Sequence, residues 1–450
     1  MLPLLVALNG FAATPRPNFI FLLADDLRWD ALGCQGNSIV QTPNIDRLAA
    51  RGARFRNHFV TTSICNVSRA SMFSGQYERR HGITDFATPF TERQWSETYP
   101  ALLRAAGYRT GFIGKFGVGS NAAVQAMSNR FDYWRGLPDQ AGLFFDRNDP
   151  TRTHKTARFG GQALEFLRDC DPGKPFCLSV SFNAPHARDR QPREFWPDAR
   201  DESLYEDVTI PRPPKSGAKW FEKLPEFVKN SENRRRWGWR FTNEVAFQQT
   251  VKDYYRLITG IDREVGRIMA LLDERGLADN TVILFTSDNG FFLGDRGLAD
   301  KWLMYEESIR VPLIVLDPRL PAARRGTTVD AIALNIDLAP TMLDMAGVRV
   351  PKPMQGRSLT PLMVGKTPRG WRSEFFYEHH TRADIIPQSE GVRTERWKYI
   401  RWVKAEPPLE ELYDLDNDPG EERNLVSNPQ HAKTLADLRA RWKKLGRQLK

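Results

Sequence analysis

The sequence predicts an α/β protein in which a doubly wound, mostly parallel sheet lies between helices and is followed by a smaller α+β domain. Strongly apolar segments of strand length recur along the chain, at residues 18–24, 109–113, 175–182 and 281–286. Amphipathic helical segments separate them, and this alternation is typical of parallel strands that are buried on both faces. Short antiparallel strand patterns gather beyond about residue 362.

Each of these strands ends at a polar group. The groups are, in chain order, Asp25-Asp26, Gly114-Lys115, Asn183-Ala184-Pro185-His186 and Ser287-Asp288-Asn289-Gly290. The predicted helices between the strands lie at about residues 42–51, 99–106 and 250–274. Because ligands bind beyond the carboxyl ends of the strands in a doubly wound sheet, we expect all four groups to meet at one edge.

The length of 450 residues favours two domains. Residues 14–362 form the larger predicted domain, and residues 187–247 interrupt it as a polar insertion too long for an ordinary connection. Residues 363–450 form the predicted α+β domain. Its expected elements are strands at residues 374–377, 398–402 and 411–415 and a terminal helix at residues 431–449.

Residues 1–13 resemble a secretory signal peptide, since a short apolar stretch ends in small residues. We therefore expect an exported protein, periplasmic or secreted. No later segment approaches the roughly 18 apolar residues of a membrane helix, so we expect no membrane span. The formal net charge of +10 would draw anionic esters toward the surface, which is weak support for an acidic substrate, and we expect no nucleic-acid partner.

The four cysteines are too few and too scattered for a disulfide framework or a Cys-x-x-Cys zinc site. They are Cys34, Cys65, Cys170 and Cys177. Cys170 and Cys177 could pair across a turn in an oxidising compartment, or both could be buried thiols, and we favour the thiols.

Hard oxygen ligands follow two of the predicted strands. They are Asp25, Asp26, Asp288 and Asn289. Calcium or magnesium prefers such ligands, whereas zinc prefers nitrogen and sulfur. Either pair alone is usually a turn or a helix cap, but both pairs at one sheet edge predict a divalent cation.

Cys65 lies four residues before Arg69, and in a helix that begins near Val67 the two would share a face. An anion beside Cys65 would then meet the positive end of a helix and a guanidinium group. A buried thiol and a thiolate activated by Arg69 are the alternatives. Nothing nearby resembles a Cys-His-Asn protease signature, which argues against a thiol protease.

The segment around Cys65 makes the prediction specific. Cys65-Asn66-Val67-Ser68-Arg69-Ala70-Ser71-Met72-Phe73-Ser74-Gly75 resembles the signature of the type I, formylglycine-dependent sulfatases of the alkaline phosphatase superfamily. Other segments match that family's pattern in order: Thr42–Ala49, Gly114-Lys115, Asp288-Asn289-Gly290, Lys301, Arg310-Val311-Pro312, Tyr413-Asp414-Leu415 and Asp418-Pro419. The likeness spans nearly the whole chain and implies an alkaline-phosphatase-like α/β fold with a small C-terminal domain.

The resemblance implies that a formylglycine-generating enzyme oxidises Cys65 and that the hydrated aldehyde attacks sulfur. The alcohol then leaves, and the second hydroxyl expels sulfate and restores the aldehyde. By position, Arg69 would hold the hydrate, and Lys115 and Lys301 would bind the sulfate oxygens. His186 would protonate or hydrogen-bond the leaving oxygen. The implied ligands of the cation, Ca²⁺ rather than Mg²⁺, are Asp25, Asp26, Cys65, Asp288 and Asn289.

The sequence departs from the family at three positions. Val67 replaces the usual Pro at a position that the oxidising enzymes read. Gly117 replaces a His credited with helping the hydrate to release sulfate, so His81 or water would have to serve instead. Arg296 replaces another frequent His, and because it keeps a cation there, we expect it to bind substrate.

Three functions remain open. We favour hydrolysis of sulfate esters on a polysaccharide or glycan, because residues 300–310 are similar to stretches of N-acetylglucosamine-6-sulfatase-like enzymes. The alternatives are a phosphate or phosphonate ester hydrolase of the same superfamily and a carbohydrate-binding pseudoenzyme in which Cys65 stays a thiol. The basic, Trp-rich segment 234–240 could hold a sulfated sugar, or could form a solvated basic face with two anchoring Trp residues.

Overall fold

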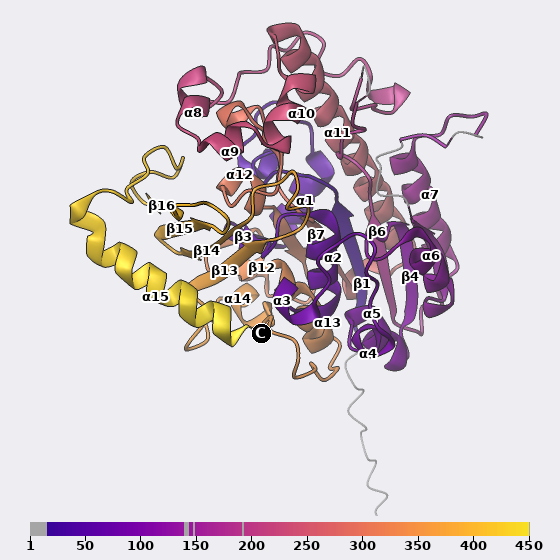
Figure 1. The fold of residues 1–450 in the computed structure, drawn as a ribbon. Helices are drawn as coiled ribbons and strands as arrows, with labels where there is room; N and C mark the ends of the chain where they lie inside the picture. The colour runs from indigo at the N-terminus through magenta and orange to yellow at the C-terminus, as the bar shows by residue number, and fades with distance from the viewer. Residues whose placement is uncertain (1–15, 139–143, 147–148, 191–192, 450) are drawn as a thin grey trace, which may run out of the picture.

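A computed structural model describes residues 16–138, 144–146, 149–190 and 193–449 of the chain. The predicted signal peptide, residues 1–13, lies outside the described residues. The predicted fold class is confirmed: a mixed, mostly parallel eight-stranded sheet lies between helices, and a smaller antiparallel sheet follows it (Figure 1).

The central sheet has the strand order β11-β2-β10-β7-β1-β6-β4-β5, and of these eight strands only β10 runs antiparallel to its neighbours. The strands are β1 (Asn18–Ala24), β2 (Ala53–Phe55), β4 (Arg109–Lys115), β5 (Tyr133–Leu137), β6 (Phe176–Ser181), β7 (Thr281–Ser287), β10 (Leu313–Leu316) and β11 (Thr327–Val329). Ala24 at the end of β1 pairs with Ser287 at the end of β7. Asp25 and Asp288 therefore leave the sheet side by side.

Successive side chains of β1 point to opposite faces of the sheet, and because all of them are buried, helices cover both faces. Ile20 and Leu22 pack in one core with α1 (Pro43–Arg51), α7 (Lys155–Arg168) and α11 (Glu244–Glu274). Phe19, Phe21 and Leu23 pack in a second core with α2 (Cys65–Ser74), α5 (Tyr99–Ala105) and α13 (Leu338–Met345). The other α-helices that precede the C-terminal sheet are short: α3 (Glu78–His81), α4 (Glu92–Ser96), α6 (Asn121–Gln125), α8 (Ala218–Glu222), α9 (Glu226–Lys229), α10 (Glu232–Arg240), α12 (Glu306–Ile309) and α14 (Thr360–Met363).

The C-terminal sheet has four antiparallel strands in sequence order, one more than the sequence predicts. They are β13 (Glu374–His379), β14 (Ser389–Thr394), β15 (Trp397–Trp402) and β16 (Leu409–Asp414). The terminal helix α15 (Ala432–Gln448) lies along this sheet (Figure 1) and buries Leu435 and Leu438 against it. Two small sheets have two strands each. In one, β3 (His58–Phe59) pairs with β12 (Ala333–Leu334), and in the other, β8 (Phe292–Leu293) pairs with β9 (Ala299–Asp300).

A shared core joins the C-terminal sheet to the rest of the molecule. Phe59 stacks on Phe375 of β13 with ring centroids 5.0 Å apart, in the same apolar cluster as Trp402. A buried charge pair crosses the same junction, since Lys398 of β15 lies 2.7 Å from Glu306 of α12. The two sheets therefore form one packed unit.

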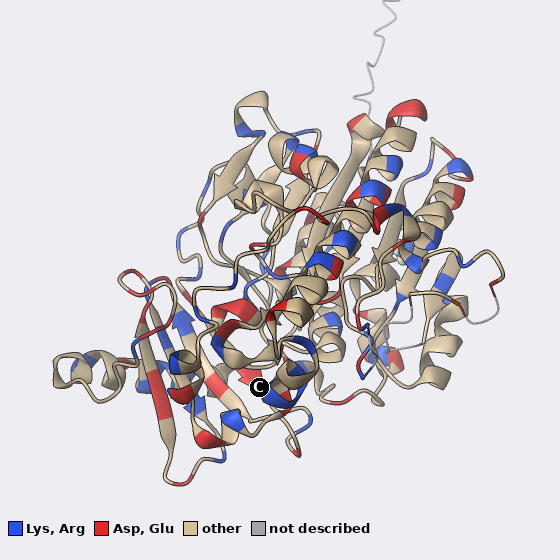
Figure 2. Cartoon of the chain, turned by 90° about the horizontal axis from the view of Figure 1, so that it is seen from above, with Lys and Arg blue, Asp and Glu red and all other residues tan. Residues whose placement is uncertain are grey.

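Cys170 and Cys177 are unpaired and buried, as predicted, and they belong to cores on opposite faces of the central sheet. No helix in the described ranges combines the length and apolar character that crossing a membrane requires. Seen from above, segments of Lys and Arg are interspersed with segments of Asp and Glu (Figure 2).

The central strand β1 offers a test of this packing. Leu22 is 0% exposed, and we expect Leu22→Ala to lower the free energy of unfolding by about 2–5 kcal/mol, because it leaves a cavity in the core. The control is Val245→Ala on α11, where the side chain is 79% exposed and the expected change is within about 0.5 kcal/mol. Denaturant titration measures both values, and equal values for the two variants would contradict the burial of β1.

Candidate functional site

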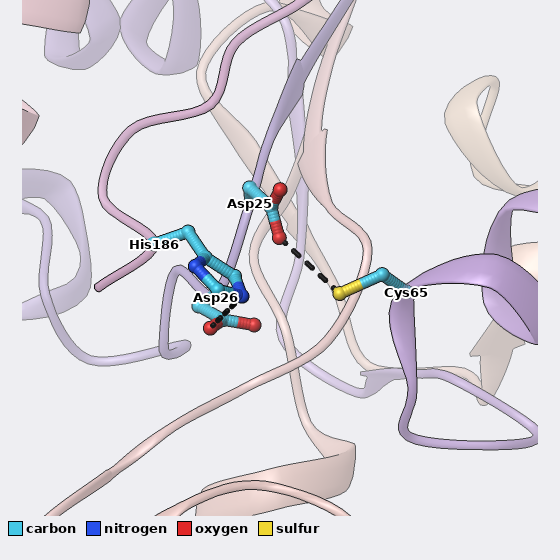
Figure 3. A group of neighbouring side chains, drawn as sticks. All are labelled: Asp25, Asp26, Cys65 and His186. Atoms are coloured by element: carbon cyan, nitrogen blue, oxygen red, sulfur yellow. Dashed lines mark hydrogen bonds and ion pairs between the residues drawn. The ribbon is translucent and has the colours of Figure 1, made fainter. Parts of the chain in front are cut away.

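Four side chains that could bind a metal converge beyond the carboxyl end of the central sheet (Figure 3). Asp25 and Asp26 follow β1, Cys65 begins α2, and His186 follows β6. Cys65 Sγ donates to Asp25 Oδ1 at 3.4 Å, and His186 Nε2 lies 3.6 Å from Asp26 Oδ2. One ligand atom from each residue lies within 4.8 Å of the others.

Asp288 and Asn289 reach the same cluster from the end of β7. The backbone N–H of Asp26 donates to Asp288 Oδ1 at 3.1 Å, and Asn289 Nδ2 donates to Asp26 Oδ1 at 2.5 Å. Asn289 Oδ1 is buried and accepts no hydrogen bond within the described part of the chain. These carboxylate and amide oxygens fit a hard divalent cation such as Ca²⁺ or Mg²⁺, and the orphaned amide oxygen is suited to be one of its ligands.

Three buried cations face these carboxylates. Lys115 Nζ donates to Asp25 Oδ2 at 2.5 Å, and Lys301 Nζ donates to both oxygens of Asp26 at 2.6 Å. Arg69 Nε donates to Asp288 Oδ2 at 2.8 Å. The arrangement offers fixed positive donors around the place where an anion would meet Cys65.

Burial and charge set the protonation of this cluster. Burial alone would raise the pKa of Asp25, but neighbouring cations, Lys115 foremost, outweigh it and hold that pKa well below its usual range. Burial, reinforced by the charge of Asp25, raises the pKa of Asp288 to about 6 and the pKa of the Cys65 thiol well above its usual range. An unmodified Cys65 is therefore a neutral thiol, which argues against the predicted alternative of a reactive thiolate.

The helix that carries Cys65 begins at Cys65 itself, two residues earlier than the Val67 start considered from the sequence. Arg69 Nη1 donates to the backbone oxygen of Lys115 at 2.6 Å and to Ser181 Oγ at 2.5 Å, so the guanidinium ties α2 to β4 and β6. Val67 is fully buried and packs in a small apolar cluster that includes Trp302. Val67 therefore contributes packing beneath the site.

The structure leaves no room for a histidine at Gly117. Its φ of 79° is in the left-handed region, and a Cβ there would lie 2.5 Å from Cδ of Arg69. A larger residue would thus displace Arg69. The suggested substitute, His81, has both ring nitrogens engaged, one 3.1 Å from Ser71 Oγ and the other accepting from the backbone N–H of Ile83 at 3.0 Å. His81 thus presents no free nitrogen to Cys65.

The loop that carries Lys301 is strained and is held by the insertion. Asp300 and Trp302, on either side of Lys301, have φ values of 67° and 83°, which cost energy unless contacts fix them. Asn233 Nδ2 donates to the backbone oxygens of Ala299 and Lys301, each at 2.8 Å. The insertion therefore fixes the backbone of Lys301.

Two arginines of the basic segment 234–240 hold Asp300. Arg236 lies 3.0 Å from Asp300, and the buried Arg240 also pairs with it. Both arginines pair with Asp189 as well, at 2.9 Å and 2.6 Å. These two arginines of the segment therefore belong to an internal ion-pair network, which the sequence did not predict, whereas the Arg235 side chain is 51% exposed.

Arg296, predicted to bind substrate, lies elsewhere. It is buried, stacks over Tyr305 at 4.4 Å, and donates to the backbone oxygens of Gly420 at 2.7 Å and Glu421 at 3.0 Å. No hydrogen bond or ion pair links it to the Asp25–Asp26 cluster in the described ranges. Its charge is used in packing the loop after β8 against the C-terminal domain.

Comparisons with known proteins agree with this geometry. Residues 17–348 match the Sulfatase family, and residues 294–448 match the family described as N-sulphoglucosamine sulphohydrolase, C-terminal. The N-acetylglucosamine-6-O-sulfatase of Bacteroides thetaiotaomicron is 32% identical over 94% of this chain and 85% of that protein. The arylsulfatase of Clostridium perfringens is 28% identical over 94% of this chain and 93% of that protein.

Solved structures share the fold of this chain. One in complex with its substrate D-glucosamine-2-N,6-O-disulfate has a TM-score of 0.82 and 29% identity, covering 97% of this chain and 98% of that chain. The phosphonate monoester hydrolase of Agrobacterium radiobacter has a TM-score of 0.80 at 22% identity, covering 97% of this chain and 96% of that chain, which shows a shared fold.

The orphaned oxygen of Asn289 generates a prediction about cation binding. After chelation and dialysis, we expect Asn289→Ala to weaken Ca²⁺ binding by at least about tenfold, because the variant lacks one oxygen ligand. Calorimetric titration with CaCl₂ measures the affinity, and circular dichroism checks the fold. The matched control is Asn129→Ala at an exposed position. An unchanged Ca²⁺ affinity in Asn289→Ala would exclude this residue as a ligand.

Proposed function

Because the chain belongs to the sulfatase family and is a sulfuric ester hydrolase, we propose that it cleaves sulfate esters on carbohydrate, with Cys65 oxidised to formylglycine as the source of the nucleophile. The observation that carries the proposal is the convergence of residue 65 with four oxygen ligands and three buried cations at one sheet edge. Such a site supplies a cation, a nucleophile position and fixed donors for a sulfuryl group.

A Ca²⁺ or Mg²⁺ ion at Asp25, Asp26, Asp288 and Asn289 would make the hydrated aldehyde at residue 65 a better nucleophile and would neutralise charge on the sulfuryl oxygens. The chain's own groups do the rest. Lys115 and Lys301 bind the sulfuryl oxygens through ammonium groups that already point into the cluster. Arg69 orients residue 65 from the same helix turn.

His186 is placed to contact the leaving oxygen. Its Nδ1 lies 2.6 Å from the backbone oxygen of Ala187, which fixes the ring and turns Nε2 toward Asp26. Burial lowers the pKa of His186 to about 3, so the ring is neutral near pH 7. With its proton on Nδ1, the neutral ring presents Nε2 as an acceptor. We therefore assign His186 to the leaving oxygen as a group that donates through Nε2 once the ring has taken up a second proton.

The sugar class follows from the relatives. A curated relative is an N-acetylglucosamine-6-O-sulfatase, and a solved structure similar to this chain contains a sulfated glucosamine as its substrate. We infer a sulfated glycan or oligosaccharide, with sulfated glucosamine as the first unit to test. An exported location and maturation by a formylglycine-generating enzyme complete the proposal, and residues 1–13 and the segment around Cys65 support these two parts.

The state of residue 65 tests the formylglycine route. In protein purified from its native host, peptide mass spectrometry is expected to find the aldehyde or its hydrate at residue 65 in place of the thiol. Cys65→Ala should lower kcat on the sulfated substrate by at least about 10³-fold, because the nucleophile is removed. Cys34→Ala, at a partly exposed cysteine, is the matched control. An intact, alkylatable thiol in fully active protein would overturn the formylglycine route, and an intact thiol in inactive protein that still binds the sugar would support the pseudoenzyme.

Matched esters separate the sulfatase from the phosphate and phosphonate hydrolases that share its fold. We expect kcat/KM for N-acetylglucosamine 6-O-sulfate to exceed that for the 6-O-phosphate by at least about tenfold, because a phosphate brings a second negative charge to a site whose cations are already paired. Release of inorganic sulfate or phosphate is measured under identical conditions. A clear preference for the phosphate would overturn the assignment.

A further inference from the structure

A separate cavity of about 420 Å³ lies where the insertion meets the C-terminal domain. One wall comes from α9 and α10, and the other comes from residues 383–388, between β13 and β14, and from the end of β15. The side chains that matter for its chemistry are Phe227, Glu232, Arg235, Gln388, Trp402 and Lys404. Its volume falls within the range of about 300–1,000 Å³ that is usual for ligand sites.

One side of this cavity packs against α2, the helix that carries Cys65. Ile386 lines the cavity and belongs to the same buried cluster as Val67 of α2 and Trp302, which follows Lys301. The backbone N–H of Glu232 donates to the backbone oxygen of Ile385 at 3.1 Å and joins the two walls. The cavity is therefore attached to the two segments that carry Cys65 and Lys301.

The lining combines an aromatic surface with hydrogen-bonding groups of both kinds. Phe227 is 37% exposed, one of few large apolar side chains so exposed in the described ranges, and it meets Trp402 edge-on at 5.2 Å. The Arg235 side chain is 51% exposed and pairs with Glu232 at 2.6 Å. Lys404 has no ion pair within the described part of the chain.

The remaining groups make the cavity suitable for a ring with many hydroxyls. Gln388 contributes an amide, Arg235 is paired with Glu232, and Asp384, which also lines the cavity, is paired with Arg382. Alternating donors and acceptors beside an aromatic ring suit the hydroxyls and apolar face of a sugar.

We propose that this cavity is a second saccharide subsite, which binds a sugar unit of the oligosaccharide beyond the one that carries the sulfate ester. The proposal rests on the proposed function, since it assumes a sulfated glycan as substrate. It assigns Phe227 and Arg235 to substrate specificity and gives them no part in the cleavage of the ester.

Two substrates test the subsite: N-acetylglucosamine 6-O-sulfate and a tetrasaccharide with the same sulfated unit at one end. We expect kcat/KM of the unmutated enzyme to be at least about tenfold higher for the tetrasaccharide. Phe227→Ala and Arg235→Ala should remove most of this difference, mainly through KM, and leave the monosaccharide value unchanged. Val403→Ala is the matched control, because Val403 is 41% exposed and adjoins Trp402 but does not line the cavity.

A binding measurement separates this proposal from the proposed function. The tetrasaccharide is titrated calorimetrically into Cys65→Ala protein, alone and combined with Phe227→Ala, and the double variant should bind at least about tenfold more weakly. If both substrates are hydrolysed and the ratio of kcat/KM for the tetrasaccharide to kcat/KM for the monosaccharide is the same in all variants, the subsite is overturned and the proposed function stands. If the enzyme hydrolyses neither substrate but the tetrasaccharide binds in a way that depends on Phe227, the proposed function is overturned and the subsite stands. Binding that Phe227→Ala leaves unchanged would overturn the subsite in either case.

Discussion

The pairing of three buried carboxylates with three buried cations is the interaction on which this molecule depends. Asp25, Asp26 and Asp288 are fully buried, and each would destabilise the fold severely without a partner. Their partners come from α2, from the end of β4 and from the loop after β9. The charges are thus satisfied only when segments from most of the larger domain are in place, so the same contacts that complete the fold also build the site.

The sequence predicts much of this arrangement because the relevant signals are local. Asp25-Asp26 and Asp288-Asn289 directly follow strongly apolar strands, and the topology of a parallel sheet brings such strand ends together. The placement of Lys115 and His186 follows from the same rule. What the sequence reveals is therefore the edge at which the chemistry occurs and the residues that occupy it.

Contacts between distant segments could not be predicted in the same way. Asp300 and Arg240 form a buried pair, but nothing in either local sequence specifies the other. The sequence assigns Arg296 to substrate because its position matches a family histidine, yet the residue stacks over Tyr305 and donates to backbone oxygens of the C-terminal domain. Strand β14 was missed because its alternation is weak, and Gly391 within it makes room for Met304, whose Sδ would lie 2.4 Å from a Cβ at that position.

The buried pair between Lys398 and Glu306 has a consequence for how such proteins diversify. Lys398 also lies 2.5 Å from Glu421, so a lysine of the C-terminal sheet neutralises carboxylates on both sides of the junction. Arg393 of the same sheet also pairs with Glu306, at 3.5 Å. A recombinant chimaera that exchanged the C-terminal domain with that of a relative would leave Glu306 as an uncompensated buried charge unless equivalent cations came with it. The two domains are therefore matched at this junction, and a change of exposed lining residues disturbs the fold less than an exchange of whole domains.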